Sequence, residues 1–156
     1  MRIDFDRFVP LGLDGKNESQ WILAGLIVSA LSALINFSNQ YSDALSRLYV
    51  YGLGTKRLIP GAVMAPFYQT VMGCEVGFVL VCLAMALLAV YHYHYHTQGS
   101  KSIYLMRRLP RSWELHMRCL GLPVLGAAGA MASLGLLTVF FYLIYRFCTP
   151  AQCLPH

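Results

Sequence analysis

Three histidines alternate with tyrosines in the sequence YHYHYH, at the end of an apolar run. His92 and His96 are four residues apart, so a helix would place both on one face at a spacing compatible with metal binding. A strand would place His94 on the same face as these two. Tyrosines and titratable side chains are also typical of a helix end at a membrane interface. We favour this second interpretation and expect neither a metal site nor another cofactor.

The five cysteines fall into two groups. Cys74, Cys82 and Cys119 lie in or beside apolar runs, where a thiol behaves as a small apolar side chain. Cys148 and Cys153 flank the turn-favouring sequence TPAQ in the C-terminal tail. If this tail lies outside the cell, the two thiols can form an intrachain disulfide, because disulfides persist in oxidising surroundings. Free thiols are the alternative.

No set of residues indicates catalysis. The chain has no H-E-x-x-H sequence, no Ser/His/Asp arrangement and no pair of acids close together within an apolar run. Residues 52–56 read GLGTK, which lacks the spacing of the phosphate-binding loop G-x-x-x-x-G-K-[ST]. The sequence therefore predicts neither enzymatic activity nor nucleotide binding by this chain.

The composition indicates a lipid environment. Of the 156 residues, 57% are hydrophobic and 12% are charged, whereas a soluble domain carries about a quarter charged residues. The net charge of +5 fits basic loops at a membrane surface better than nucleic-acid binding. Three apolar runs, at residues 21–37, 71–91 and 120–147, are long enough for helical crossings. We therefore predict an all-α integral membrane protein with three transmembrane helices.

The parts outside these runs are short. Residues 1–20 are expected to form an N-terminal segment that is either interfacial or frayed, and residues 148–156 form a tail. Between the first two runs we expect a short helix over Asp43 to Val50, followed by glycines and prolines that interrupt helices. Glu75 and Pro123 lie near the starts of the second and third runs, where neither is costly.

Small residues recur at helical spacing in the first and third runs. Such residues let the backbones of neighbouring helices approach closely. The predicted helix-packing residues are Gly25, Ser29, Ala33, Gly126, Gly129, Ala130 and Ser133.

The basic residues are distributed unevenly between the two sides that three crossings define. Eight of the twelve lie on the side of the N-terminus and of the loop over residues 92–119. These are Arg2, Arg7, Lys16, Lys101, Arg107, Arg108, Arg111 and Arg118. Because cytoplasmic loops carry the excess of Lys and Arg, we predict a multi-pass protein of the cell membrane with a cytoplasmic N-terminus and an external C-terminus.

The loop over residues 92–119 is basic, aromatic and partly amphipathic. Ser100 can cap a first short helix, a cytoplasmic elbow that Pro110 would end. Ser112 can cap a second helix that continues into the third apolar run. The same residues also fit a basic loop held at the surface by anionic lipid, and the sequence leaves both interpretations open.

Within this loop, the sequence SKSIYLMRRLPRSW resembles the cytoplasmic loop between spans two and three of ABC exporter permeases of the second type. In that family, a short coupling helix with a Leu-Pro step and nearby basic residues transmits closure of a separate ATPase subunit to the spans. The step is Leu109-Pro110 here. The resemblance implies a cytosolic ATPase as partner. The predicted contact residues are Ile103, Met106, Arg107, Arg108, Leu109 and Arg111.

The chain departs from that family because it has three predicted spans, whereas the family's membrane domain usually has six. We therefore expect a non-catalytic membrane subunit of an ABC-type export complex, acting with another membrane chain. Two alternatives remain open: a small scaffold or regulatory subunit of another membrane complex, and a self-assembling pore. The expected partners are the lipid bilayer, an ATPase subunit and other membrane subunits or further copies, but no nucleic acid.

Overall fold

The computed structural model describes residues 14–52, 55–59, 61–98 and 113–153. Within these residues the chain is mostly helical, and three helices are long and apolar enough to cross a membrane. They are α1 (Gly15–Ser46), α3 (Val76–Gln98) and α5 (Trp113–Cys148). The shorter elements are β1 (Tyr49–Gly52), β2 (Thr55–Leu58), α2 (Phe67–Val71) and the 3₁₀ turn η2 (Ala151–Cys153).

The long helices extend beyond the apolar runs that predicted them. Helix α1 continues through the polar residues after Phe37 and ends at Ser46, so the separate short helix predicted over Asp43 to Val50 is wrong. Helix α5 begins at Trp113, which agrees with the prediction that a helix starting near Ser112 continues into the third run. Pro123 therefore lies in the interior of α5, and the prediction that it lies near the start of its helix is wrong.

A small antiparallel hairpin follows α1, so the described chain is not entirely helical. Strand β1 pairs with β2 in a register that places Tyr49 opposite Leu58 and Val50 opposite Arg57. The aromatic and β-branched side chains of β1 favour an extended backbone over a helix. The sequence prediction missed these strands because it used the glycines of this segment only as helix breakers.

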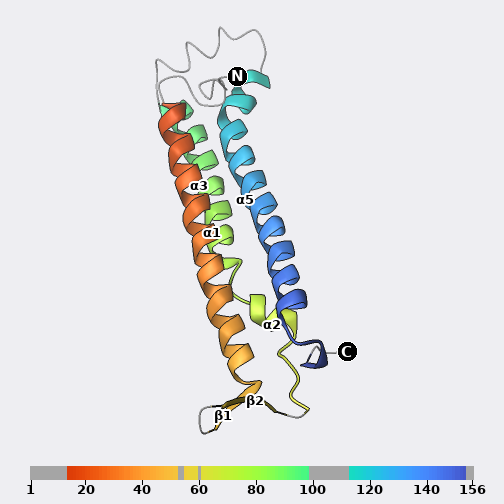
Figure 1. Ribbon diagram of the computed structural model, residues 1–156. Coiled ribbons are helices and arrows are strands. Elements are labelled where there is room, and N and C mark those ends of the chain that lie inside the picture. Colours follow the sequence, from red (N-terminus) through yellow and green to blue (C-terminus); the bar gives the residue numbers. More distant parts are fainter. Residues whose placement is uncertain (1–13, 53–54, 60, 99–112, 154–156) are drawn as a thin grey trace. The chain divides into compact units, whose positions relative to one another are not determined.

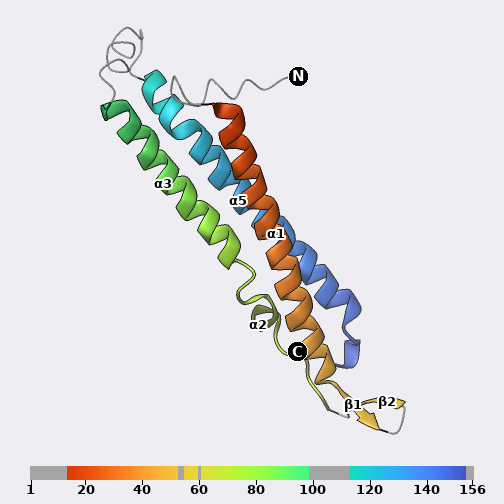
Figure 2. The same cartoon turned by 90° about the vertical axis from the view of Figure 1, so that its left-hand side faces the viewer.

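The described chain divides into two compact units. The first unit comprises the described parts of residues 1–28 and 78–132, and the second comprises those of residues 29–77 and 133–156. In the first unit, α1, α3 and α5 lie side by side, as both views of the ribbon show (Figures 1 and 2). The second unit contains the hairpin, α2 and η2 together with the remaining parts of the long helices.

The second unit has its own small core. Leu48, Met64, Tyr145 and Cys153 are buried together, and the Tyr145 hydroxyl donates a hydrogen bond to the carbonyl of Ala65 (2.8 Å). The backbone N–H of Met64 donates to the carbonyl of Cys153 (2.8 Å). These contacts fix the segment before α2 against the end of the chain.

Aromatic and small side chains hold the long helices together within the second unit. The rings of Phe37 and Phe141 are stacked, with their centroids 4.2 Å apart. Ser29 is buried, and its Cβ lies 3.1 Å from the position that a Cβ on Gly77 would occupy. Gly73, in the turn before α3, has a φ of 89°, a conformation that favours glycine over residues with a Cβ.

Candidate functional site

Helix α1 starts at a capping aspartate. The Asp14 side chain accepts hydrogen bonds from the backbone N–H groups of Lys16 (3.2 Å) and Asn17 (3.4 Å). An N-cap carboxylate satisfies N–H groups that the first helical turn leaves without partners. Glu18 follows in the first turn, where the helix dipole favours a negative charge. The local sequence therefore both starts the helix and fixes the position of Glu18.

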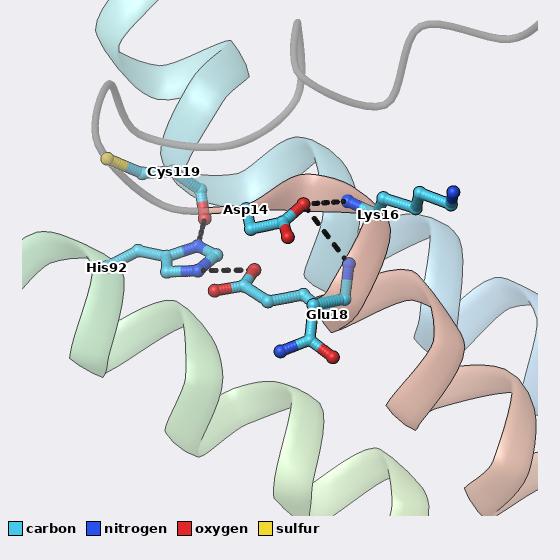
Figure 3. A network of polar contacts seen from close by, with 6 residues as sticks. Asp14, Lys16, Glu18, His92 and Cys119 are labelled. Carbon is cyan, nitrogen blue, oxygen red and sulfur yellow. Dashed lines mark hydrogen bonds and ion pairs between the residues drawn. The ribbon is translucent and has the colours of Figure 1, made fainter.

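His92 of α3 is fully buried between the other two long helices of the first unit. Its Nε2 lies 3.1 Å from Oε2 of Glu18 on α1, and its Nδ1 lies 3.1 Å from the carbonyl oxygen of Cys119 on α5. The imidazole is 0% exposed and the Glu18 side chain is 18% exposed. Figure 3 shows the ring between its two oxygen partners. We refer to Glu18, His92 and the Cys119 carbonyl as the helix joint.

Pro123 explains why the Cys119 carbonyl is available to His92. In an α-helix, a carbonyl oxygen accepts a hydrogen bond from the N–H four residues later. The residue four positions after Cys119 is Pro123, which lies inside α5 and has no backbone N–H. In an apolar environment, a carbonyl freed in this way is satisfied by a side chain of a neighbouring helix. His92 provides that donor.

The two hydrogen bonds of His92 determine how many protons the helix joint holds. A carbonyl oxygen only accepts, so Nδ1 carries a proton and donates it to Cys119. Between Nε2 and Glu18 there is then one further proton, which belongs either to an imidazolium facing a carboxylate or to a carboxylic acid facing a neutral imidazole. In both forms the pair has no net charge, which lowers the cost of burying two titratable groups.

A second polar contact joins α3 to α5 beside the helix joint. The Tyr93 hydroxyl lies 2.8 Å from Nδ1 of His116. His92 and Tyr93 lie at the start of the predicted loop over residues 92–119, and His116 and Cys119 lie at its end. Both contacts therefore connect the beginning of this loop to its end. The contact between Glu18 and His92 connects the beginning of the loop to α1.

Small residues lie where the helices of the first unit approach one another. A Cβ placed on Gly126 would be 2.5 Å from Sδ of Met85 and 3.2 Å from Cγ2 of Ile22. A Cβ on Gly25 would be 3.7 Å from Val81, an ordinary contact distance. These glycines belong to the predicted helix-packing set. Three other members of this set, Ala130, Ala33 and Ser29, are buried, and Ser133 is half-buried. A Cβ on the remaining member, Gly129, would be 3.7 Å from Leu26.

The cysteines are all free thiols in the structure. Cys148 is exposed at the end of α5, whereas Cys153 is buried in the core of the second unit. The Cys148–Cys153 disulfide is not formed here and stays a prediction. Burial raises the pKa of the Cys74 thiol, and the Glu75 carboxylate beside it adds to the rise. A raised pKa keeps this thiol protonated and unreactive near neutral pH.

Several predicted residues are not part of this site. The six predicted ATPase contacts, Ile103, Met106, Arg107, Arg108, Leu109 and Arg111, lie outside the described residues, as does the predicted elbow helix. His94 is exposed, and the side chain of His96 is not among those that the structure describes. Among the residues that the structure describes, no cluster of three His, Cys, Asp or Glu side chains is placed to hold a metal ion.

Sequence reasoning missed the helix joint. It placed Glu18 in a polar N-terminal segment and interpreted His92 as an interfacial residue. The signal that was available is Pro123, because a proline inside a helix predicts an unpaired carbonyl at position 119 and hence a nearby donor.

The chain was compared with protein-family models, with curated proteins and with solved structures, and no match was found in any of the three.

Proposed function

We propose that this protein is a non-catalytic membrane subunit of an ABC-type export complex, which couples a cytosolic ATPase to the membrane through the loop over residues 92–119. The observation that carries the proposal is the helix joint. It ties both ends of this loop to α1. The nature of the partner comes from the resemblance of residues 100–113 to the coupling loop of such permeases.

Insertion into a membrane is supported by the surfaces of the three long helices. Large apolar side chains are exposed along each of them, including Leu31 on α1, Leu87 on α3 and Leu136 on α5, with exposed fractions of 54%, 71% and 74%. In water, so much exposed apolar surface would favour association or aggregation. In a bilayer the same surface contacts lipid chains. The proposed crossings lie within Gly15–Ser46, Val76–His94 and Cys119–Cys148.

The helix joint gives the proposed coupling a physical route. His92 and Cys119 belong to helices that enter and leave the loop, and Glu18 belongs to the first turns of α1. A partner that displaces the loop changes the distances from the imidazole to both oxygens. Because each hydrogen bond depends steeply on distance and angle, such a displacement moves α1 or breaks the joint.

The proposed orientation can be tested with single cysteines. We expect Ser42→Cys to react with a membrane-impermeant thiol reagent on intact cells, and Ser100→Cys to react only after the cells are opened. The chain used would have its five native cysteines replaced by alanine. The basis is the excess of Lys and Arg on the side of residues 92–119. Reaction of Ser100→Cys on intact cells would reverse the proposed orientation.

Association with an ATPase is tested by co-purification in mild detergent. We expect the native chain to bring down a nucleotide-binding ATPase and Met106→Asp to lose it, because a docked apolar anchor would become a buried unpaired charge. The double variant Arg107→Glu with Arg108→Glu should weaken association, more so at low salt. Lys56→Glu with Arg57→Glu is the matched control on the predicted external side and should retain the ATPase.

The outcomes of this experiment also separate the alternatives. A different membrane enzyme in the purified complex would favour a scaffold or regulatory subunit, and a complex of this chain with itself alone would favour a pore. If no ATPase accompanies the native chain, or if both loop variants retain it fully, the loop is better explained as a segment bound to anionic lipid.

A further inference from the structure

The second unit contains a polar pocket that the proposed coupling function does not use. Its volume is about 240 Å³. One wall consists of residues near the end of α1 and of Arg47, which follows this helix. The other wall consists of residues of α2 and the residue before its N-cap. The lining residues are Gln40, Asp43, Ala44, Arg47, Ala65, Gln69 and Thr70. Five of these seven side chains are polar or charged, which is unusual in a protein whose exposed helix surface is mainly apolar.

A buried hydroxyl without a partner lies in the wall of this pocket. Thr70 is 2% exposed, and its Oγ1 has no hydrogen-bond partner among the described residues. Buried hydroxyl groups in native proteins nearly always make a hydrogen bond, so an exception requires an explanation. A ligand atom in the pocket would supply the missing partner.

The pocket also presents a positive and a negative group that do not neutralise each other. Asp43 lies in the last turn of α1, Arg47 follows the last residue of this helix, and both side chains are exposed. No ion pair joins their side chains in the part of the chain that the structure describes. The guanidinium of Arg47 suits a carboxylate, and the carboxylate of Asp43 suits an ammonium group.

The amide side chains add further polar groups to the pocket. The Gln40 amide is fixed by the hydrogen bond that it donates to the carbonyl of Met72 (2.6 Å), which leaves its oxygen as an acceptor. The Gln69 amide donates to the Tyr68 hydroxyl (3.2 Å). The pocket thus combines one cation, one anion, two amides and one unpaired hydroxyl.

We infer that this pocket binds a small zwitterion of the amino-acid type, with its carboxylate at Arg47, its ammonium group at Asp43 and a hydrogen bond to Thr70. The volume is below the range of about 300–1,000 Å³ that is usual for drug-sized ligands, so it suits a smaller molecule. The lining residues all follow the first apolar run, residues 21–37, and precede α3, and our orientation places this region outside the cell. It is independent of any ATPase.

The test uses the full chain purified in detergent, with thermal unfolding as the readout. We expect at least one of the standard L-amino acids at millimolar concentration to raise the unfolding temperature, because a ligand that binds only the folded state stabilises it. The N-acetyl and carboxamide derivatives of the same amino acid should have no effect. Phosphoethanolamine is included because a lipid headgroup carries an ammonium and an anion of similar spacing.

Variants then locate the site. Titration calorimetry should show a loss of affinity of roughly tenfold or more for Arg47→Gln and for Asp43→Asn, since each removes a charged hydrogen-bond partner. Thr70→Val keeps the shape of the side chain and should weaken binding while it leaves the ligand-free protein at least as stable as before. Arg57→Gln, on β2 outside the pocket, is the matched control and should bind normally.

Three results with the native chain would overturn the proposal. They are no stabilisation by any amino acid, equal stabilisation by the blocked derivatives, and binding of phosphoethanolamine in preference to amino acids. Unchanged affinity in Thr70→Val would show that the hydroxyl does not bond to the ligand. Unchanged affinity in Arg47→Gln would show that the ligand does not bind in this pocket.

Discussion

Replacing His92 by leucine is expected to lower the free energy of unfolding by about 2–6 kcal/mol, because two oxygens lose their hydrogen-bond partner at about 1–3 kcal/mol each. The variant leaves the Glu18 carboxylate and the Cys119 carbonyl without their donor. The Cys119 carbonyl cannot be satisfied by its own helix, because its helical partner would be Pro123. Unfolding by sodium dodecyl sulfate in mixed micelles, followed by tryptophan fluorescence, measures the change.

A double-mutant cycle with Pro123→Ala isolates the carbonyl contact. Alanine restores the N–H that the Cys119 carbonyl lacks, so the helix supplies its own hydrogen bond. In this background, the cost of His92→Leu should be smaller by about 1–3 kcal/mol, the penalty of an unsatisfied buried acceptor. If the cost of His92→Leu is the same with proline and with alanine at position 123, the proposed role of Pro123 is wrong.

Glu18→Gln serves as the matched control for the other half of the helix joint. A glutamine keeps the length of the side chain, and its amide can donate to a neutral imidazole. This variant should therefore cost clearly less than Glu18→Ala, which leaves Nε2 of His92 buried without a partner. Equal losses in the two variants would indicate that the charge, and not the hydrogen bond, stabilises the joint.

Gly126→Leu is expected to destabilise the protein by about 1–3 kcal/mol through overpacking. A Cβ at this position would lie 2.5 Å from Sδ of Met85, and a leucine adds further atoms in the same place. Gly126→Ala should cost less, because methionine is flexible and can move aside. In a Met85→Ala background, Gly126→Ala should cost less than it does in the native chain, because the Sδ atom that it would meet is absent.

Gly135→Ala is the control, since a Cβ there would meet nothing within 4 Å. It should leave stability unchanged or raise it by up to about 1 kcal/mol, the difference in helix propensity between the two residues. The same unfolding assay compares all of these variants. A loss at Gly135 as large as that at Gly126 would contradict the close approach of the helices at Gly126.

The sequence predicted the three long apolar helices because this signal is local and strong. A run of uncharged apolar residues specifies a helix without reference to any other part of the chain. The ends of the helices were less certain, since polar residues between Phe37 and Ser46 have no periodicity that separates helix from loop. The hairpin was missed for the same reason, although Tyr49 to Tyr51 have the composition of a strand.

The candidate site was harder to predict because its parts are far apart in sequence. Glu18 and His92 are 74 residues apart, and a single sequence contains no record of which distant residues meet. The pattern at Pro123 shows that a carbonyl would need a donor, but not which of the five histidines or other donors would supply it. The polar pocket is likewise invisible in the sequence, since Asp43 and Arg47 look like an ordinary surface pair at helical spacing.

The core of the second unit has a consequence for how the chain folds during synthesis. Leu48 and Met64 emerge from the ribosome early, but the residues that cover them, Tyr145 and Cys153, are among the last described residues of the chain. The chain is made from its N-terminus, so the segment between α1 and α3 remains without a completed core until the far end of α5 and η2 have been made. It reaches its final packing only after Tyr145 and Cys153 have emerged, and a chain that stops before Tyr145 leaves this segment without its core.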